Sequence, residues 1–265
     1  MAIRFAHVSD LHLCDGPDAE PGLSAHAYAV AEAMARDLAR IRDALDFVVV
    51  SGDLTDDAHP ASFAAFERLF RPLGLPVLAI PGNHDGPAAY LQQAQGGYLA
   101  DCDITGRVVE IGAIRLLGLN TCLEKKTTGA ISREDFDFVA RELAQDSAAR
   151  PVIVMHHPPF PPGLREFDDI AGQDGASEFS TLVTGAATPP IILAGHVHRA
   201  YQARRKRVTC FVAGSPAMPF ASDLPFGDSP IRPSQEECRY FVHLLDDHGD
   251  HVVTAQPFYL DGTWA

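Results

Sequence analysis

Short apolar runs alternate along the chain with longer stretches in which apolar residues recur every three or four positions. The short runs predict buried β-strands, and the three-to-four spacing predicts helices with one buried face. The expected strands cover residues 3–8, 47–50, 77–80, 114–119, 151–155, 190–194, 208–212, 240–245 and 252–256. The expected helices cover residues 23–45, 60–70 and, after an N-cap at Ser132, about 133–145. This alternation is typical of an α/β protein.

Two stretches, residues 158–175 and 220–233, are rich in proline, glycine and acidic residues and are expected to be long loops. Core-like strands follow both stretches, so neither is expected to link two domains. The 265-residue chain is therefore predicted to form a single domain, residues 1–265.

Polar side chains follow five of the predicted strands, close to the point where each strand ends. The motifs are Asp10-Leu11-His12, Gly52-Asp53, Gly82-Asn83-His84-Asp85, His156-His157 and Gly195-His196-Val197-His198. Open α/β sheets bind ligands at the carboxyl ends of their strands, so the five motifs are expected to converge on one site. Asp10 and His12 are expected to lie on an extended stretch and to face the same metal, as are His196 and His198.

The side chains in these motifs are imidazoles, carboxylates and an amide, a set that favours Zn, Mn, Fe, Co or Ni over calcium. No cysteine belongs to the set, which excludes a zinc finger. Each motif alone occurs often by chance, and only the five together indicate a metal site.

Composition narrows the partners of such a site. Lys and Arg number 21 against 35 Asp and Glu, which gives a formal net charge of −14. A surface this acidic argues against binding a nucleic-acid duplex or an anionic membrane. No apolar run approaches the ~20 residues of a membrane-spanning helix, and the N-terminus lacks a signal-peptide pattern. The five cysteines are odd in number and lack CxxC spacing, so we expect a cytoplasmic protein in a reducing compartment.

Together, the five motifs resemble the calcineurin-like metallophosphoesterase superfamily, whose pattern runs D-x-H, G-D, G-N-H-[DE], H and G-H-x-H. The match spans residues 10–198. The resemblance implies a two-sheet αββα sandwich with a dinuclear metal site at the carboxyl ends of the strands. It implies that one metal is held by Asp10, His12, Asp53 and His198. It implies that a second metal is held by Asn83, His156, His196 and also Asp53, which would bridge the two.

A closer resemblance is to the bacterial class III cyclic-nucleotide phosphodiesterases and their glycerophosphodiesterase relatives. The strings that carry it are Ser9-Asp10-Leu11-His12-Leu13, Gly52-Asp53-Leu54-Thr55-Asp56, Pro81-Gly82-Asn83-His84-Asp85, His156-His157-Pro158-Pro159 and Gly195-His196-Val197-His198-Arg199. This resemblance implies a metal-dependent phosphoric diester hydrolase. Two transition metals (Mn, Fe, Zn or Co) would share a water and present it as a hydroxide in line with the phosphorus. The expected substrates are 3′,5′-cyclic nucleotides, and glycerophosphodiesters or a broad range of small diesters are the alternative.

Two further residues are expected to handle the leaving group. His84 holds no metal in the family pattern and could donate a proton to the leaving oxygen, with Asp56 orienting its ring. Asn83 and His84 are also expected to contact the substrate. Protein phosphatases of the superfamily carry an arginine directly after the position of Asp56. Asp57 stands there in this chain, which favours monoanionic diesters over dianionic monoesters.

Substrate selectivity is expected in residues 158–175, which leave the site directly after His157. Phe160 could stack on a base and Arg165 could meet a phosphate or ribose oxygen. The alternative is that Phe160 packs the loop down and that Arg165 pairs with a nearby carboxylate. His157 itself is expected to pack or to support a neighbouring ligand. The basic run Arg204-Arg205-Lys206-Arg207 is expected to be a solvated turn.

Other functions fit the motifs less well. A nuclease of the superfamily is disfavoured by the net charge of −14 and by the lack of an added DNA-capping domain. The lipid A pyrophosphohydrolase branch usually has arginine where His84 stands. A non-catalytic scaffold would have lost ligands, whereas this chain keeps all seven. The expected partner is a small phosphodiester, and the resemblance leaves a homo-oligomer open.

Overall fold

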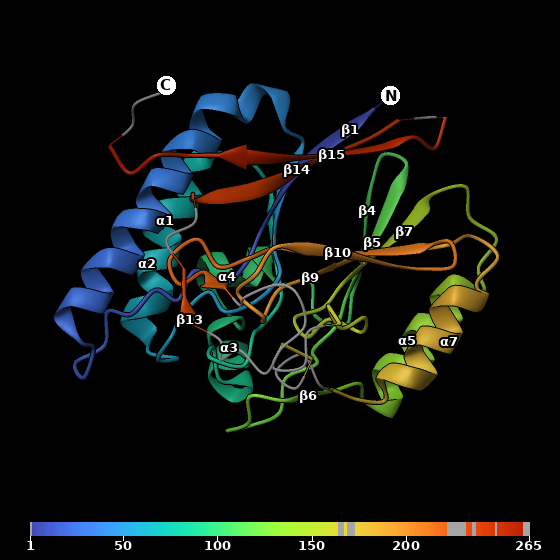
Figure 1. Cartoon of the computed structure of the whole chain (residues 1–265), viewed down its shortest axis with the longest axis horizontal. Coiled ribbons are helices and arrows are strands. Elements are labelled where there is room, and N and C mark those ends of the chain that lie inside the picture. Colours follow the sequence, from blue (N-terminus) through green and yellow to red (C-terminus); the bar gives the residue numbers. More distant parts are fainter. Residues whose placement is uncertain are drawn as a thin grey trace.

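Two β-sheets contain the apolar runs of the chain (Figure 1). The structure is a computed structural model that describes residues 2–163, 167–168, 173–221, 232–234, 237–246 and 248–261. The first sheet contains, in spatial order, β15 (His251–Pro257), β14 (Arg239–Leu245), β1 (Ile3–Val8), β2 (Phe47–Val50) and β3 (Val77–Ala79). The second contains β10 (Tyr201–Arg205), β11 (Val208–Val212), β9 (Ile191–Ala194), β7 (Arg150–Val154), β5 (Ile114–Gly118) and β4 (Val108–Ile111).

Helices cover the outer face of each sheet (Figure 1). Against the first sheet lie α1 (Pro21–Ile41), α2 (Pro60–Phe70) and α4 (Gly97–Cys102). Against the second lie α5 (Arg133–Leu143) and α7 (Ala176–Gly185). The remaining short elements are α3 (Pro87–Gln93), the 3₁₀ turns Arg42–Ala44 and Arg71–Leu73, and two small ladders, β12 (Phe220–Ala221) with β13 (Arg232–Pro233) and β6 (Gly129–Ala130) with β8 (Gln173–Asp174).

Strand β2 shows why both faces of each sheet are apolar. Val48 and Val50 point towards the helices, whereas Phe47 and Val49 point towards the other sheet, because successive side chains alternate along a strand. All four are fully buried. The result is a four-layer arrangement with one core between the sheets and one under each helical layer. The expected αββα sandwich is confirmed.

The central strands of both sheets are parallel, and antiparallel strands lie towards the edges. Strands β1, β2 and β3 run parallel in the first sheet, and β5, β7, β9 and β11 run parallel in the second. Their carboxyl ends therefore open at one side of the sandwich, and this is where the polar motifs begin.

Several elements differ from the sequence-based expectation. The first helix begins at Pro21, where the Glu20 side chain accepts a hydrogen bond from Leu23 N, and its α-helical part ends at Ile41. The short elements α3, α4, α7, β4 and β10 were not expected, because runs of four to ten residues carry little periodic signal. Ser132 does cap α5, accepting a hydrogen bond from Asp135 N.

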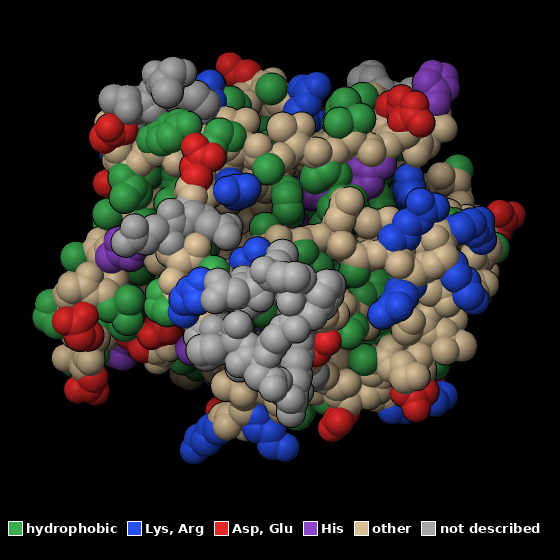
Figure 2. All heavy atoms as spheres, in the orientation of Figure 1, with side chains coloured by type: hydrophobic (Ala, Val, Ile, Leu, Met, Phe, Trp, Pro, Cys, Tyr) green, Lys and Arg blue, Asp and Glu red, His purple; other side chains and the backbone are tan. Residues whose placement is uncertain are grey.

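The surface is charged unevenly. Figure 2 shows basic side chains gathered towards the end of the β10–β11 hairpin, where Arg204, Arg205, Lys206 and Arg207 are all exposed. Lys206 and Arg207 form the expected turn, whereas Arg204 and Arg205 lie in strand β10 instead. Arg207 donates to the carbonyls of Ala186 and Ala187. Within the described part of the chain, no helix is both long and apolar enough to cross a membrane.

Candidate metal centre

The polar motifs follow strands of both sheets and meet where the sheets face each other. Asp10 and His12 follow β1, Asp53 follows β2, and Asn83 follows β3. The second sheet contributes His156 after β7, and His196 and His198 after β9. The contacts below join side chains from both sheets.

Four of these side chains form a first ligand group, and all four are buried. Asp10, His12, Asp53 and His198 each offer one ligand atom within 4.8 Å of the others. The Nε2 atoms of His12 and His198 lie 2.8 Å apart. His12 Nε2 is 3.7 Å from an Asp53 carboxylate oxygen, and His198 Nε2 is 3.6 Å from one of Asp10.

The other ring nitrogen of each histidine is held by an oxygen. His12 Nδ1 lies 2.9 Å from Asp56 Oδ1, and His198 Nδ1 lies 2.9 Å from the carbonyl of Met218. A carbonyl only accepts, so Nδ1 of His198 carries the hydrogen and its Nε2 presents a lone pair to the group. Two such lone pairs at 2.8 Å repel each other unless a cation or proton lies between them. This donor set and its outer hydrogen bonds fit a transition metal.

A second group adjoins the first through Asp53. His156 Nε2 lies 3.1 Å from Asn83 Oδ1 and 3.3 Å from Asp53 Oδ2. His156 Nδ1 is 2.9 Å from the carbonyl of Ser51, which again leaves Nε2 facing the group. The ring of His196 lies 5.1 Å from that of His156, centroid to centroid. Asp53 thus contacts histidines of both groups.

The backbone at these residues is not extended, contrary to the expectation from their alternate spacing. Asp10, His12, Asp53, His196 and His198 all have positive φ angles, between 50° and 76°. This left-handed region is unfavourable for residues with a Cβ, at roughly 1–3 kcal/mol each, and such residues cluster at functional sites. Hydrogen bonds between the loops stabilise this backbone conformation, since Leu11 N and His12 N both donate to Asp53 O.

His84 and Asp56 lie at the rim of the first group. His84 Nδ1 is 3.0 Å from Asp56 Oδ1, and the His84 backbone N–H donates to Asp53. Burial alone would lower the pKa of His84, but the hydrogen bond to Asp56 and the charges of Asp53 and Asp56 raise it to about 9. Hydrogen bonds from His12 and His84 lower the pKa of Asp56. The His84 side chain is 39% exposed, so it is accessible from solvent.

One supporting residue, Asp85, was missed by the sequence reasoning although it belongs to the Gly82-Asn83-His84-Asp85 string. It is fully buried and accepts hydrogen bonds from Leu54 N, Thr55 N, the Thr55 hydroxyl and Gly82 N. It therefore ties the loop after β2 to the loop after β3. The carbonyls of Ser51 and Met218 were also missed, because a backbone group leaves no signature in the sequence.

The expected substrate contacts in residues 158–175 are not supported for Phe160. Its side chain is fully buried in the core under α5 and α7, so the ring packs and offers no face to a base. Its carbonyl accepts a hydrogen bond from the Tyr201 hydroxyl. Arg165 lies outside the described residues.

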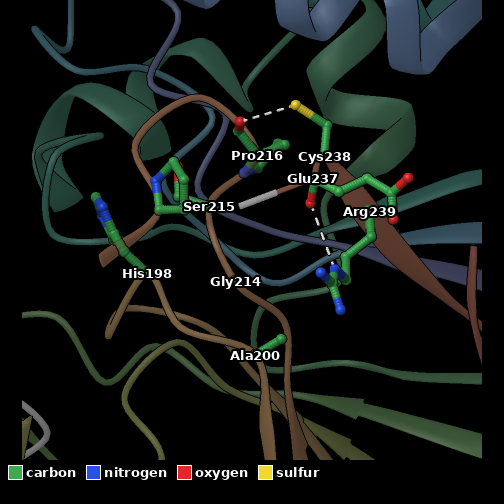
Figure 3. Close-up of a pocket in the computed structure, with 9 residues that line it drawn as sticks. His198, Ala200, Gly214, Ser215, Pro216, Glu237, Cys238 and Arg239 are labelled. Carbon is green, nitrogen blue, oxygen red and sulfur yellow. Dashed lines mark hydrogen bonds between the residues drawn. The ribbon is translucent and has the colours of Figure 1, made fainter. Parts of the chain in front are cut away.

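A small pocket lies behind His198 (Figure 3). Its lining includes Ser215, Pro216, Cys238 and Arg239, and the His198 imidazole points away from Cys238 and Arg239. The Cys238 thiol donates to the Pro216 carbonyl. The pocket therefore borders the first ligand group through His198, and the other ligand-group residues are not in its lining.

Comparison with known proteins agrees with this geometry. The family model for calcineurin-like phosphoesterases matches residues 3–200. The chain belongs to this family. The family and the ligand cluster together support two metal ions at the site. The enzyme is a metal-dependent phosphoesterase.

Three proteins illustrate the similarity. A probable cyclic nucleotide phosphodiesterase of Synechococcus sp. is 28% identical over 263 residues, which cover 96% of each chain. A probable glycerophosphodiester phosphodiesterase of Arcobacter nitrofigilis is 26% identical over 180 residues, covering 68% of this chain and 66% of the relative. A dimetal phosphatase from Danio rerio has the same fold, with a TM-score of 0.70 at 14% identity over 96% of each chain. The resemblance to bacterial phosphodiesterases is confirmed.

Proposed function

We propose that this protein is a two-metal phosphodiesterase that hydrolyses small phosphodiesters, with 3′,5′-cyclic nucleotides preferred. The observation that carries the proposal is the pair of imidazole Nε2 atoms, from His12 and His198, that lie 2.8 Å apart beside two buried carboxylates. The name of the Synechococcus relative, which aligns over 96% of this chain, supports the cyclic-nucleotide class.

Seven side chains would hold the metals. Asp10, His12, Asp53 and His198 would hold one, and Asp53, Asn83, His156 and His196 the other. When bound, the two metals lower the pKa of a water and neutralise phosphate oxygens. The mixed imidazole and carboxylate donors suit Mn, Fe, Zn or Co.

His84 would act on the leaving group. Asp56 holds its Nδ1 side, which leaves Nε2 free to donate a proton to the departing oxygen. Burial lowers the pKa of His84, but the hydrogen bond to Asp56 raises it, which favours the protonated imidazole that this role needs. Asn83, beside it, would contact the phosphate as well as the metal.

The position after Asp56 supports a diester rather than a monoester. The Asp57 carboxylate accepts hydrogen bonds from the backbone of Gly16 and His59. It therefore anchors a loop. Protein phosphatases of the superfamily carry an arginine at this position, whose guanidinium would neutralise the second negative charge of a phosphate monoester. A monoanionic diester needs no such help.

The test is a kinetic panel in Mn²⁺ with a 3′,5′-cyclic nucleotide, a glycerophosphodiester, an aryl diester and the matching aryl monoester. We expect the cyclic nucleotide to give the highest kcat/KM and the monoester the lowest. A higher value for the glycerophosphodiester would support the second candidate substrate, which the Arcobacter relative's name favours. Faster monoester hydrolysis, or equal rates after chelation, would contradict the proposal.

We also propose that the enzyme works in the cytoplasm. All five cysteines are free thiols, and four of them are buried. A reducing compartment such as the cytoplasm keeps cysteine thiols from forming disulfides.

A further inference from the structure

We infer that His157 is a positioning residue for the second metal, holding the imidazole of His196 and the loop at residues 121–130 in place without binding a metal itself. The inference rests on the proposed function, because it takes His156 and His196 as ligands of that metal. His157 directly follows one ligand in the sequence and is fully buried.

Both ring nitrogens of His157 are already in use. Nε2 lies 2.9 Å from the Thr127 carbonyl, which only accepts, so Nε2 carries the hydrogen. The Thr121 hydroxyl accepts the His157 backbone N–H at 3.2 Å and lies 2.8 Å from Nδ1, to which it donates. The imidazole is therefore locked in one tautomer and has no lone pair left for a metal.

The His157 ring is in contact with this loop and with the two proposed ligands His156 and His196. Its centroid lies 4.2 Å from that of His196 and 5.1 Å from that of His156. Gly129 of the loop is also close, because an added Cβ there would come within 2.5 Å of the His157 ring. Any shift of the loop is thus transmitted through His157 to His196.

Other hydrogen bonds gather the same segments at His157. Gln173 donates from its side chain to the His157 carbonyl at 2.8 Å, and Ala130 N donates to Thr121 O at 2.9 Å. Strands β6 and β8 pair beside them. The first metal's histidines have separate supports, in Asp56 for His12 and the Met218 carbonyl for His198. Loss of the His157 contacts should therefore weaken one metal position and spare the other.

The test uses Mn²⁺ alone, titrated into metal-free protein and followed by calorimetry and electron paramagnetic resonance. His157→Phe keeps an aromatic ring at this position but removes both hydrogen bonds of the imidazole. We expect the first Mn²⁺ to bind as in the wild type and the second ~10–100-fold more weakly, as is typical when an outer partner is lost. The spectrum should change from that of a coupled pair to the six lines of isolated Mn²⁺.

Two matched pairs separate this role from a general structural one. His243→Phe makes the same change at another fully buried histidine, on β14, and should alter the melting temperature without changing Mn²⁺ binding. Thr121→Val should weaken the second Mn²⁺, whereas Thr121→Ser, which keeps the hydroxyl, should restore it. This pair decides the matter if His157→Phe does not fold.

Two wild-type-like Mn²⁺ affinities in His157→Phe, or in Thr121→Val where His157→Phe does not fold, would overturn the inference. Equal weakening of both positions would also overturn it, because it would indicate a general loss of structure. If the wild type itself binds fewer than two Mn²⁺, the proposed function fails first, and the variants are not needed to show it.

Discussion

Asp53 is the residue on which both ligand groups depend. Its carboxylate lies 3.3 Å from His156 and 3.7 Å from His12, and it accepts the backbone N–H of His84. It is fully buried, so its side chain has little freedom to move, and its backbone has a left-handed φ of 50°.

Replacing Asp53 with alanine removes the one carboxylate shared by both groups. We expect Asp53→Ala to lose metal affinity by more than the ~10–100-fold typical of an outer partner and to lose most of its activity. Elemental analysis of metal per chain, together with turnover of an aryl diester, checks this. Near wild-type turnover with two metals bound would remove Asp53 from the bridging role.

His84 should behave differently, because it is assigned to the leaving group and not to a metal. We expect His84→Ala to keep both metals and to lose ~10²–10⁴-fold in kcat for an alcohol leaving group. For a diester of an acidic phenol the loss should be much smaller, since such a group departs without a proton. Equal losses for the two leaving groups would contradict the role.

At the scale of residues, the sequence predicts which side chains belong to the site but not the packing and backbone conformation that position them. The candidate ligand residues could be predicted because imidazoles and carboxylates recur after strands. The burial of Phe160 could not be predicted, because an aromatic residue just past the end of a strand is compatible with either a core or a binding site. The left-handed backbone at Asp10 and His12 was also hidden, since neither is a glycine.

At the scale of elements, each loop after a strand is shaped by close contact with the next. A Cβ on Gly82, after β3, would lie 2.1 Å from Asp53 Oδ1 and 2.2 Å from Asp53 N, after β2. Because one of these atoms is backbone, rotation of a side chain cannot relieve the clash. The space at Gly82 is what lets the two loops share a site.

We therefore expect Gly82→Ala to displace Asp53, with loss of metal and of activity comparable to Asp53→Ala. Gly185→Ala is the matched control, because nothing lies within 4 Å of its Cβ position, and it should bind metal normally. Metal titration of both variants gives the comparison. Normal binding in Gly82→Ala would show that the loops can separate without harm.

Elements with a local signal were predictable and those without one were not. Ser132, with Asp135 three residues later, marked the start of α5 correctly. Helices α3 and α4, of seven and six residues, are too short to show a periodic stripe. Their positions depend on packing against the first sheet, which a single sequence does not display.

At the scale of the whole molecule, the core between the sheets contains histidines. His7 on β1 and His243 on β14 are fully buried, and His251 on β15 lies 2.9 Å from His243. Burial lowers the pKa of His7 to about 3 and that of His251, with help from the charge of Arg150, to about 4. Burial and the neighbouring histidines also hold the pKa of His243 well below its usual range.

These groups should make the fold sensitive to acid. Their ordinary pKa is 6.5, so the unfolded chain takes up protons that the folded chain refuses once the pH drops below that value. Stability is then full above pH 6.5 and falls towards the folded pKa values, by up to ~1.4 kcal/mol per pH unit for each of the fully buried His7 and His243. Urea unfolding of metal-free protein at pH 7 and pH 5 should show a smaller loss in His243→Phe than in the wild type. An identical loss would mean that His243 does not titrate on unfolding.

The meeting of side chains from two sheets at one site also has a consequence for folding. Asp10 contacts the backbone of His196, and His12 contacts His198, each across 186 positions of the chain. Closing so large a loop is among the slower events of folding, and it requires that the sheets have already docked. The complete site therefore needs both sheets, although Asp10, His12, Asp53 and Asn83 all follow strands of the first sheet. We therefore expect a metal ion bound by side chains of both sheets to slow unfolding more than it speeds folding, because these contacts form only once the sheets have docked.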